Sequence, residues 1–92
     1  MALELRWDFR VPQGLRSLPD SERRLVTRTI LSLLEDPRPR RARSLPGKPN
    51  WFRLEEGPFS LVYALDPQES TLTVYGVSRE RELLGPDPGE QT

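Results

Sequence analysis

Residues 51–79 contain three runs of strand-forming residues, WFRLEE, FSLVYALD and TLTVYGVSR. The runs are rich in β-branched and aromatic residues and are separated only by Gly57-Pro58 and by residues 67–70, which is typical of strands joined by turns. Links this short cannot hold a crossover, so neighbouring runs must pair antiparallel. The sequence therefore predicts a three-stranded antiparallel meander.

The two faces of this predicted sheet differ, because successive side chains of a strand point to opposite faces. One face is almost purely apolar and carries Phe52, Leu54, Phe59, Leu61, Tyr63, Leu65, Leu72 and Val74. The other face is mixed and carries Trp51, Arg53, Glu55, Ser60, Val62, Ala64, Thr71, Thr73, Tyr75 and Val77, together with Arg79 if the last strand stays extended to its end. We expect the first face to be covered and the second to be open to a partner.

The N-terminal part of the chain supplies the predicted cover. In residues 3–9, LELRWDF, apolar residues alternate with polar ones, which indicates a half-buried strand with Trp7 in the core. Residues 11–18 place Val11, Leu15 and Leu18 at helical spacing, which predicts a short helix.

A longer helix is predicted up to Asp36, where the following proline stops it. Its start is marked by Pro19 and Asp20, and its apolar stripe consists of Leu25, Val26, Ile30, Leu33 and Leu34. The predicted fold is therefore α+β, with the order strand, helix, helix and three-stranded meander, and with both helices packed on one face of the sheet. We expect one domain over residues 1–84 and a flexible tail over residues 85–92.

The segment between helix and meander, PRPRRARSLPGKPNW, carries five cations and no acid in a chain whose 14 basic and 14 acidic residues cancel. The cations are Arg38, Arg40, Arg41, Arg43 and Lys48. Four prolines predict that this segment is an irregular loop. Its charge favours phosphate binding, with a solvated loop or a site for an acidic partner as the alternatives.

The composition excludes several classes of site. The chain has no cysteine and no histidine, so it lacks thiolate and imidazole metal ligands and the usual neutral-pH proton shuttle. We expect no metal and no cofactor. No apolar run approaches the ~20 residues that cross a bilayer, and no signal-peptide pattern is present, so we expect a cytoplasmic protein without a membrane partner.

The order of elements and several motifs together resemble the RelE/ParE superfamily of toxins from type II toxin–antitoxin pairs. The motifs are the D-P stop after the longer helix, the basic loop through LPGKP, the strand WFRLEE, the LVY strand that ends in an acid, and the closing RER. They extend over roughly residues 3–84. The resemblance implies an antitoxin partner, and it implies either messenger RNA cleavage on the ribosome, as in the RelE branch, or poisoning of DNA gyrase, as in the ParE branch.

The resemblance also assigns candidate catalytic residues. The family's basic residue in the second strand falls on Arg53, and the first arginine of the closing RER falls on Arg79, with Arg81 beside it.

Three positions depart from the family pattern. Glu55 stands where some members have a second basic residue, Ser60 stands where an arginine is expected, and Leu84 stands where an aromatic residue, usually tyrosine, is expected.

RNA cleavage by a 2′-hydroxyl needs a base, positive charge at the phosphate and a donor for the leaving oxygen. Arginine serves only as the positive charge, because it stays protonated. The base would therefore be Glu55, with Tyr75 as the nearest donor, unless Glu55 is an ion-pair partner of Arg53 or Arg79. Trp51 and Tyr75 can also stack RNA bases, although Trp51 alternatively caps the edge of the sheet.

Two classes of function follow. The first is a ribosome-dependent messenger RNA endonuclease that a cognate antitoxin holds inactive. The second is a non-enzymatic inhibitor of the same fold that binds gyrase, the ribosome or only an antitoxin. The departures at Glu55, Ser60 and Leu84 favour the second class, whereas Arg53, Arg79 and the basic loop favour the first.

Overall fold

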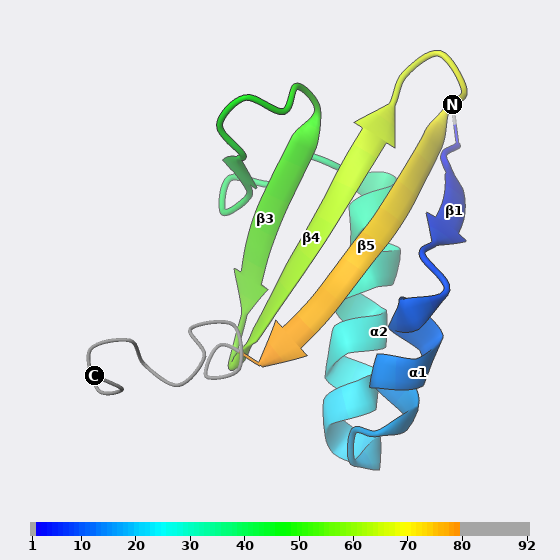
Figure 1. The fold of residues 1–92 in the computed structure, drawn as a ribbon, viewed down its shortest axis with the longest axis vertical. Helices are drawn as coiled ribbons and strands as arrows, with labels where there is room; N and C mark the ends of the chain where they lie inside the picture. The colour runs from blue at the N-terminus through cyan, green and yellow to red at the C-terminus, as the bar shows by residue number, and fades with distance from the viewer. Residues whose placement is uncertain (1, 80–92) are drawn as a thin grey trace.

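The computed structural model describes residues 2–79, with the exception of the Arg79 side chain. The elements are β1 (Glu4–Trp7), α1 (Arg10–Arg16), α2 (Asp20–Glu35), β2 (Arg43–Ser44), β3 (Trp51–Glu56), β4 (Phe59–Asp66) and β5 (Thr71–Arg79). The strands form one sheet in the order β1-β5-β4-β3-β2, and both helices lie on the same face of it (Figure 1). The predicted α+β fold is confirmed, whereas the domain boundary at residue 84 and the tail lie outside the described residues.

The meander of β3, β4 and β5 pairs antiparallel, as predicted. The N-terminal strand adds to its outer edge: β1 pairs parallel with β5, with Glu4 opposite Thr71 and Trp7 opposite Val74. This places Arg6 beside Thr73, in a row that continues across β4 to β3. β1 and β5 are therefore neighbours in space, and α1 and α2 carry the chain across one face of the sheet from β1 at one edge to β2 at the other.

The prediction that the basic segment has no regular structure is wrong at two residues. Arg43 and Ser44 form β2, which pairs antiparallel with β3 opposite Arg53 and Phe52. The four prolines flank these two residues, so both retain the backbone N–H groups that a strand needs. The chain then returns to β3 through a turn in which the Leu45 N–H donates to the Trp51 carbonyl over 3.0 Å.

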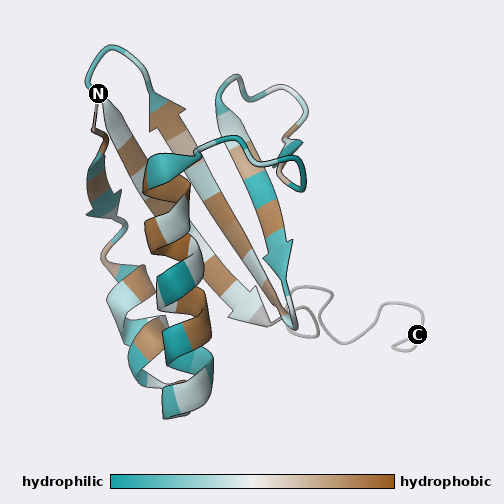
Figure 2. Cartoon of the chain, turned by 180° about the vertical axis from the view of Figure 1, so that it is seen from behind, coloured by the Kyte–Doolittle hydropathy of each residue, from teal (hydrophilic) through white to brown (hydrophobic). Residues whose placement is uncertain are grey.

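The core lies between the helices and the sheet face that the sequence predicted to be covered. It contains Val11, Leu15, Val26, Ile30, Leu33, Phe52, Leu54, Phe59, Leu61, Tyr63, Leu72 and Val74. Brown residues recur along α2 and β4 where the two pack together in Figure 2. The apolar stripe of α2 and the apolar face of the meander thus bury each other, and water is excluded from that face of the sheet.

Trp7 is not a core residue, which corrects the sequence-based expectation. Its side chain is 41% exposed, whereas Leu3 and Leu5 of the same segment pack against the core. Trp7 is the last residue of an edge strand, so a neighbouring strand covers it on one side only. Phe9, which follows β1, is 77% exposed.

A β-bulge in β5 changes which face its last residues occupy. Val62 pairs with Gly76 but Tyr63 pairs with Val74, so Tyr75 is an extra residue in β5. The strand is therefore not regular to its end, and parity inverts after the bulge. Val77 packs against the core instead of lying on the mixed face, because it pairs with Leu61.

The same inversion moves the backbone position of Arg79. The sequence placed Arg79 on the mixed face on the condition that the strand was unbroken. In the structure its Cα partner is Phe59, which belongs to the covered face.

A hydrogen bond ties the start of the basic segment to the core. The hydroxyl of the fully buried Tyr63 donates to the carbonyl of Pro37 over 2.7 Å. Burial, and then the negative charge of Asp36, raise the pKa of Tyr63 to about 12. The ring also stacks with Phe52 at 5.4 Å between centroids. The chain leaving α2 is thereby held at a fixed place beside the sheet.

Candidate functional site

The face of the sheet opposite the helices is the candidate site, and we call it the open face. One row of paired residues on it runs Arg43, Arg53, Val62 and Gly76, from β2 to β5. Gly76 leaves the floor bare at the β5 end of this row, since a Cβ atom there would meet nothing within 4 Å. The row therefore presents two guanidinium groups next to an uncovered stretch of backbone.

The pairing of Arg43 with Arg53 sets two like charges directly opposite each other. Like charges in this position destabilise a sheet unless an anion lies between or above them. Arg53 is half-buried, and its Nε is buried without a hydrogen-bond partner among the described residues. Forked guanidinium groups bind phosphate and carboxylate in bidentate fashion. The pair is thus arranged to receive an oxyanion.

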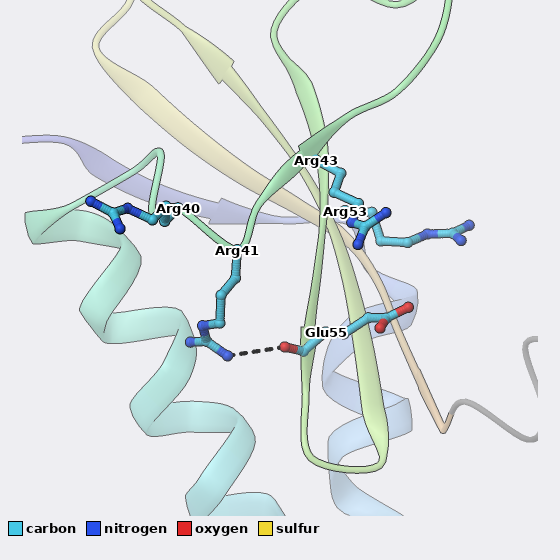
Figure 3. A pocket seen from close by; sticks show the side chains of 5 residues that line it. All are labelled: Arg40, Arg41, Arg43, Arg53 and Glu55. Carbon is cyan, nitrogen blue, oxygen red and sulfur yellow. Dashed lines mark hydrogen bonds between the residues drawn. The ribbon is translucent and has the colours of Figure 1, made fainter.

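These two arginines line a hollow of about 270 Å³, which we call the arginine hollow. Its lining consists of Arg40, Arg41, Arg43, Arg53 and Glu55. Figure 3 shows that the side chains of Arg43, Arg53 and Glu55 extend to one side of β3, whereas those of Arg40 and Arg41 extend toward α2.

The basic segment therefore divides into two groups instead of forming one footprint. Arg41 is held on the helix side, where it forms an ion pair with Glu56 and donates to the Glu55 carbonyl over 3.1 Å. Arg38 donates to the Asn50 side chain over 3.2 Å and lies 5.5 Å from the centroid of the Phe52 ring.

Glu55 is exposed and has no ion-pair partner among the described side chains. The interpretation of Glu55 as the partner of Arg53 therefore finds no support in the described geometry. Its carboxylate lies two positions from Arg53 on the same strand and on the same face, a separation of roughly 7 Å along β3. A base and a cation are thus available at neighbouring positions.

An aromatic stack crosses the open face next to the arginine hollow. The rings of Trp51 and Tyr75 are stacked, with 4.4 Å between centroids and 18° between planes. The residue that pairs with Trp51 on β4 is the small Ala64. Lys48 lies 4.8 Å from the centroid of the Trp51 ring, so both the lysine and the phenol contact the indole.

A second hollow of about 380 Å³ lies on the far side of this stack, and we call it the aromatic hollow. Its lining includes Arg6, Asn50, Trp51, Thr71, Thr73 and Tyr75. Thr71 and Thr73 were predicted on the mixed face, whereas Arg6 and Asn50 were not predicted to belong to a site. The sequence carries no signal for Arg6, because only the parallel pairing of β1 with β5 brings it to this face.

The remaining sequence-predicted positions are less accessible. Ser60 is only 2% exposed, and its hydroxyl has no hydrogen-bond partner among the described residues, so this position is not on an open surface. Thr71 is 5% exposed. Arg81 and Leu84 lie outside the described residues, and the side chain of Arg79 is likewise not described.

Two classes of site have no candidate in the part of the chain that the structure describes. No group of three or more metal-ligating side chains comes together within residues 2–79. No described helix is long and apolar enough to cross a membrane. The chemistry available on the open face is therefore positive charge, carboxylates at Glu55, Asp66 and Glu69, phenol and hydroxyl donors, and aromatic rings.

No protein-family model and no curated protein matches the sequence. Solved structures match the fold. The isolated RelE toxin of Escherichia coli superposes with a TM-score of 0.76 at 22% identity over 98% of each chain. A chain of the archaeal RelE–RelB complex of Pyrococcus horikoshii gives 0.76 at 19% identity, over 86% of this chain and 96% of that one. A chain of the RelBE2 toxin–antitoxin complex of Mycobacterium tuberculosis gives 0.74 at 20% identity, over 86% and 99%. The chain has the fold of the RelE toxins.

Proposed function

We propose that this chain is the toxin of a toxin–antitoxin pair and that it cuts messenger RNA on the ribosome. The observation that carries the proposal is the opposed pair Arg43 and Arg53, with the unpartnered buried Nε of Arg53, on the open face of a RelE-like fold. A single RNA strand offers a phosphate to this pair and bases to the neighbouring aromatic residues.

The cleavage step uses the groups next to Arg53. The Glu55 carboxylate takes the proton of the 2′-hydroxyl, whose oxygen forms a bond to phosphorus while the bond to the 5′ oxygen breaks. Arg53 neutralises the charge that grows on the phosphate in the transition state. The leaving 5′ oxygen takes a proton from the phenol of Tyr75 or from water. Arg79 and Arg81 are two further candidates for stabilising this charge, and they rest only on the resemblance to the family.

The partner that holds such a toxin inactive is proposed to be an antitoxin with an acidic segment. Its carboxylates would occupy the arginine hollow and block Arg43 and Arg53 from RNA. The structural neighbours from Pyrococcus horikoshii and Mycobacterium tuberculosis are toxin–antitoxin complexes, which supports a partner of this kind.

A non-enzymatic inhibitor is the second candidate, and two observations favour it. Ser60 stands buried where an arginine is expected, and Glu55 stands where some family members have a second basic residue. Such a protein would bind the ribosome or DNA gyrase through the same arginines without cutting RNA.

Primer extension on ribosomes programmed with a short message tests the proposal. The wild type should produce defined cuts, Arg53→Gln should lower the cutting rate far more than ribosome binding, and Glu55→Gln should lower the rate alone. Arg24→Gln, on the outer face of α2, is the charge-matched control and should cut normally. The product of the adjacent reading frame should suppress cutting. Ribosome binding without any cut would reject the nuclease and leave the binding inhibitor.

A further inference from the structure

One ring of the aromatic stack, that of Tyr75, has a face on which no other ring or cation of the described residues stacks. The indole of Trp51 is contacted by Lys48 on one side, 4.8 Å from the ring centroid, and by Tyr75 on the other. No other ring and no cation of the described residues stacks on Tyr75, which is half-buried and lines the aromatic hollow. A planar group that joins the stack has room only at Tyr75.

We propose that Tyr75 is the stacking platform for one unpaired RNA base, which sits in the aromatic hollow while the phosphate of the same nucleotide occupies the arginine hollow. This inference deepens the proposed function and rests on it. Trp51 is a positioning residue in this arrangement, because Lys48 and Tyr75 already lie over its ring and leave no face on which a base could stack. The sequence suggested that both Trp51 and Tyr75 stack RNA bases, and this proposal assigns the stacking to Tyr75 alone.

The bulge in β5 explains why Tyr75 occupies this place. As the extra residue between Val74 and Gly76, Tyr75 has no partner position on β4. Bulges re-aim side chains and often lie next to functional sites. Contact with Trp51 then fixes the ring before any ligand arrives, so binding a base costs little side-chain entropy.

The aromatic hollow has the size and polarity that a base requires. Its volume of about 380 Å³ lies within the roughly 300–1,000 Å³ of small-molecule sites. Arg6, Asn50 and Thr73 line it together with the carboxylates of Asp66 and Glu69, and they carry the donors and acceptors that base edges need. The two carboxylates repel a phosphate but accept hydrogen bonds from the amino groups of bases. These polar groups make the hollow suited to a base and not to an apolar side chain.

The distance between the two hollows fits consecutive parts of one strand. Arg53 on β3 and Tyr75 on β5 have only β4 between them, so their backbone positions lie roughly 10 Å apart across the open face. A base and a phosphate joined by a ribose span a comparable distance. One nucleotide can therefore place its phosphate at Arg53 while the base stacks on Tyr75.

The test compares two short single-stranded RNAs that are identical except at one central position, which carries 2-aminopurine in one and no base in the other. Binding constants for the full chain come from fluorescence anisotropy. The wild type and Tyr75→Phe should bind the base-containing RNA about 5- to 150-fold more tightly, the equivalent of ~1–3 kcal/mol per stacked base. Tyr75→Ala should lose this preference and bind both RNAs alike.

Two results would overturn the inference while sparing the proposed function. One is a preference that survives in Tyr75→Ala, and the other is a wild type that binds both RNAs equally. Arg43→Ala separates the two claims, because it should weaken binding of both RNAs by the same factor. A wild type that binds neither RNA would reject both claims.

A second readout uses unaltered protein and so does not depend on the folding of any variant. Stacking quenches 2-aminopurine, so its emission should fall when the wild type saturates the RNA. Emission that stays unchanged at saturation would contradict a base stacked on Tyr75.

Discussion

The covered face and the open face are built by the same three strands, yet they differ in what holds them. On the covered face, Leu61 and its neighbours are almost fully buried against α2. On the open face, Arg53 is half-buried with an unpartnered Nε and stands opposite a like charge. Most of the stabilising burial is therefore on the covered face. On the open face, the unpartnered Nε of Arg53 and its repulsion with Arg43 would be relieved by a bound anion.

The largest expected effect breaks the covered face. Leu61→Ala should lower the free energy of unfolding by about 2–5 kcal/mol, because it leaves a cavity between β4 and α2. Val62→Ala is the matched control, since it alters the adjacent residue on the open face, where the side chain is half-buried and no closed cavity forms. Urea denaturation measures both. Equal losses would mean that the two faces do not differ as described.

A smaller effect is expected where the basic segment joins the core. Tyr63→Phe leaves the Pro37 carbonyl without its donor and should cost about 1–3 kcal/mol. The variant should also change the alkaline limb of the stability curve. Because the pKa of Tyr63 is raised to about 12 in the folded state, its contribution is full below the unfolded value near 10 and is lost as pH rises toward 12.

Denaturation at a series of pH values checks this prediction. Wild type should lose stability between pH ~10 and ~12 more steeply than Tyr63→Phe. Identical slopes in wild type and Tyr63→Phe would contradict the role given to the buried phenol.

The covered face was predictable because it depends on periodicity. The short links between strands allow only an antiparallel meander. The alternation of apolar residues in the strands and their helical spacing in α2 identified the residues that bury each other, such as Leu33 and Leu61. The prediction for Trp7 was wrong because burial also depends on the position of the strand in the sheet. The pattern of apolar residues does not reveal that a strand lies at the edge of the sheet.

The open face was predictable only in part, because it depends on pairing. Parity placed Arg53, Trp51 and Tyr75 correctly on it. The bulge at Tyr75 that moves Val77 to the core has one sequence signal, Gly76 inside the strand, and simple parity does not take it into account. The division of the loop arginines follows from an ion pair between Arg41 and Glu56, residues far apart in the chain.

The central claim is that RNA lies on the open face, and the salt dependence of binding tests it most directly. Affinity for a short single-stranded RNA is measured over a range of salt concentrations for wild type, Arg53→Gln and Arg24→Gln. The slope of log K against log salt should shrink by about 0.7 for Arg53→Gln, the loss of one phosphate contact, and should stay unchanged for Arg24→Gln on the outer face of α2. Equal slopes for Arg53→Gln and wild type, or an equal loss in both variants, would contradict an RNA site on this face.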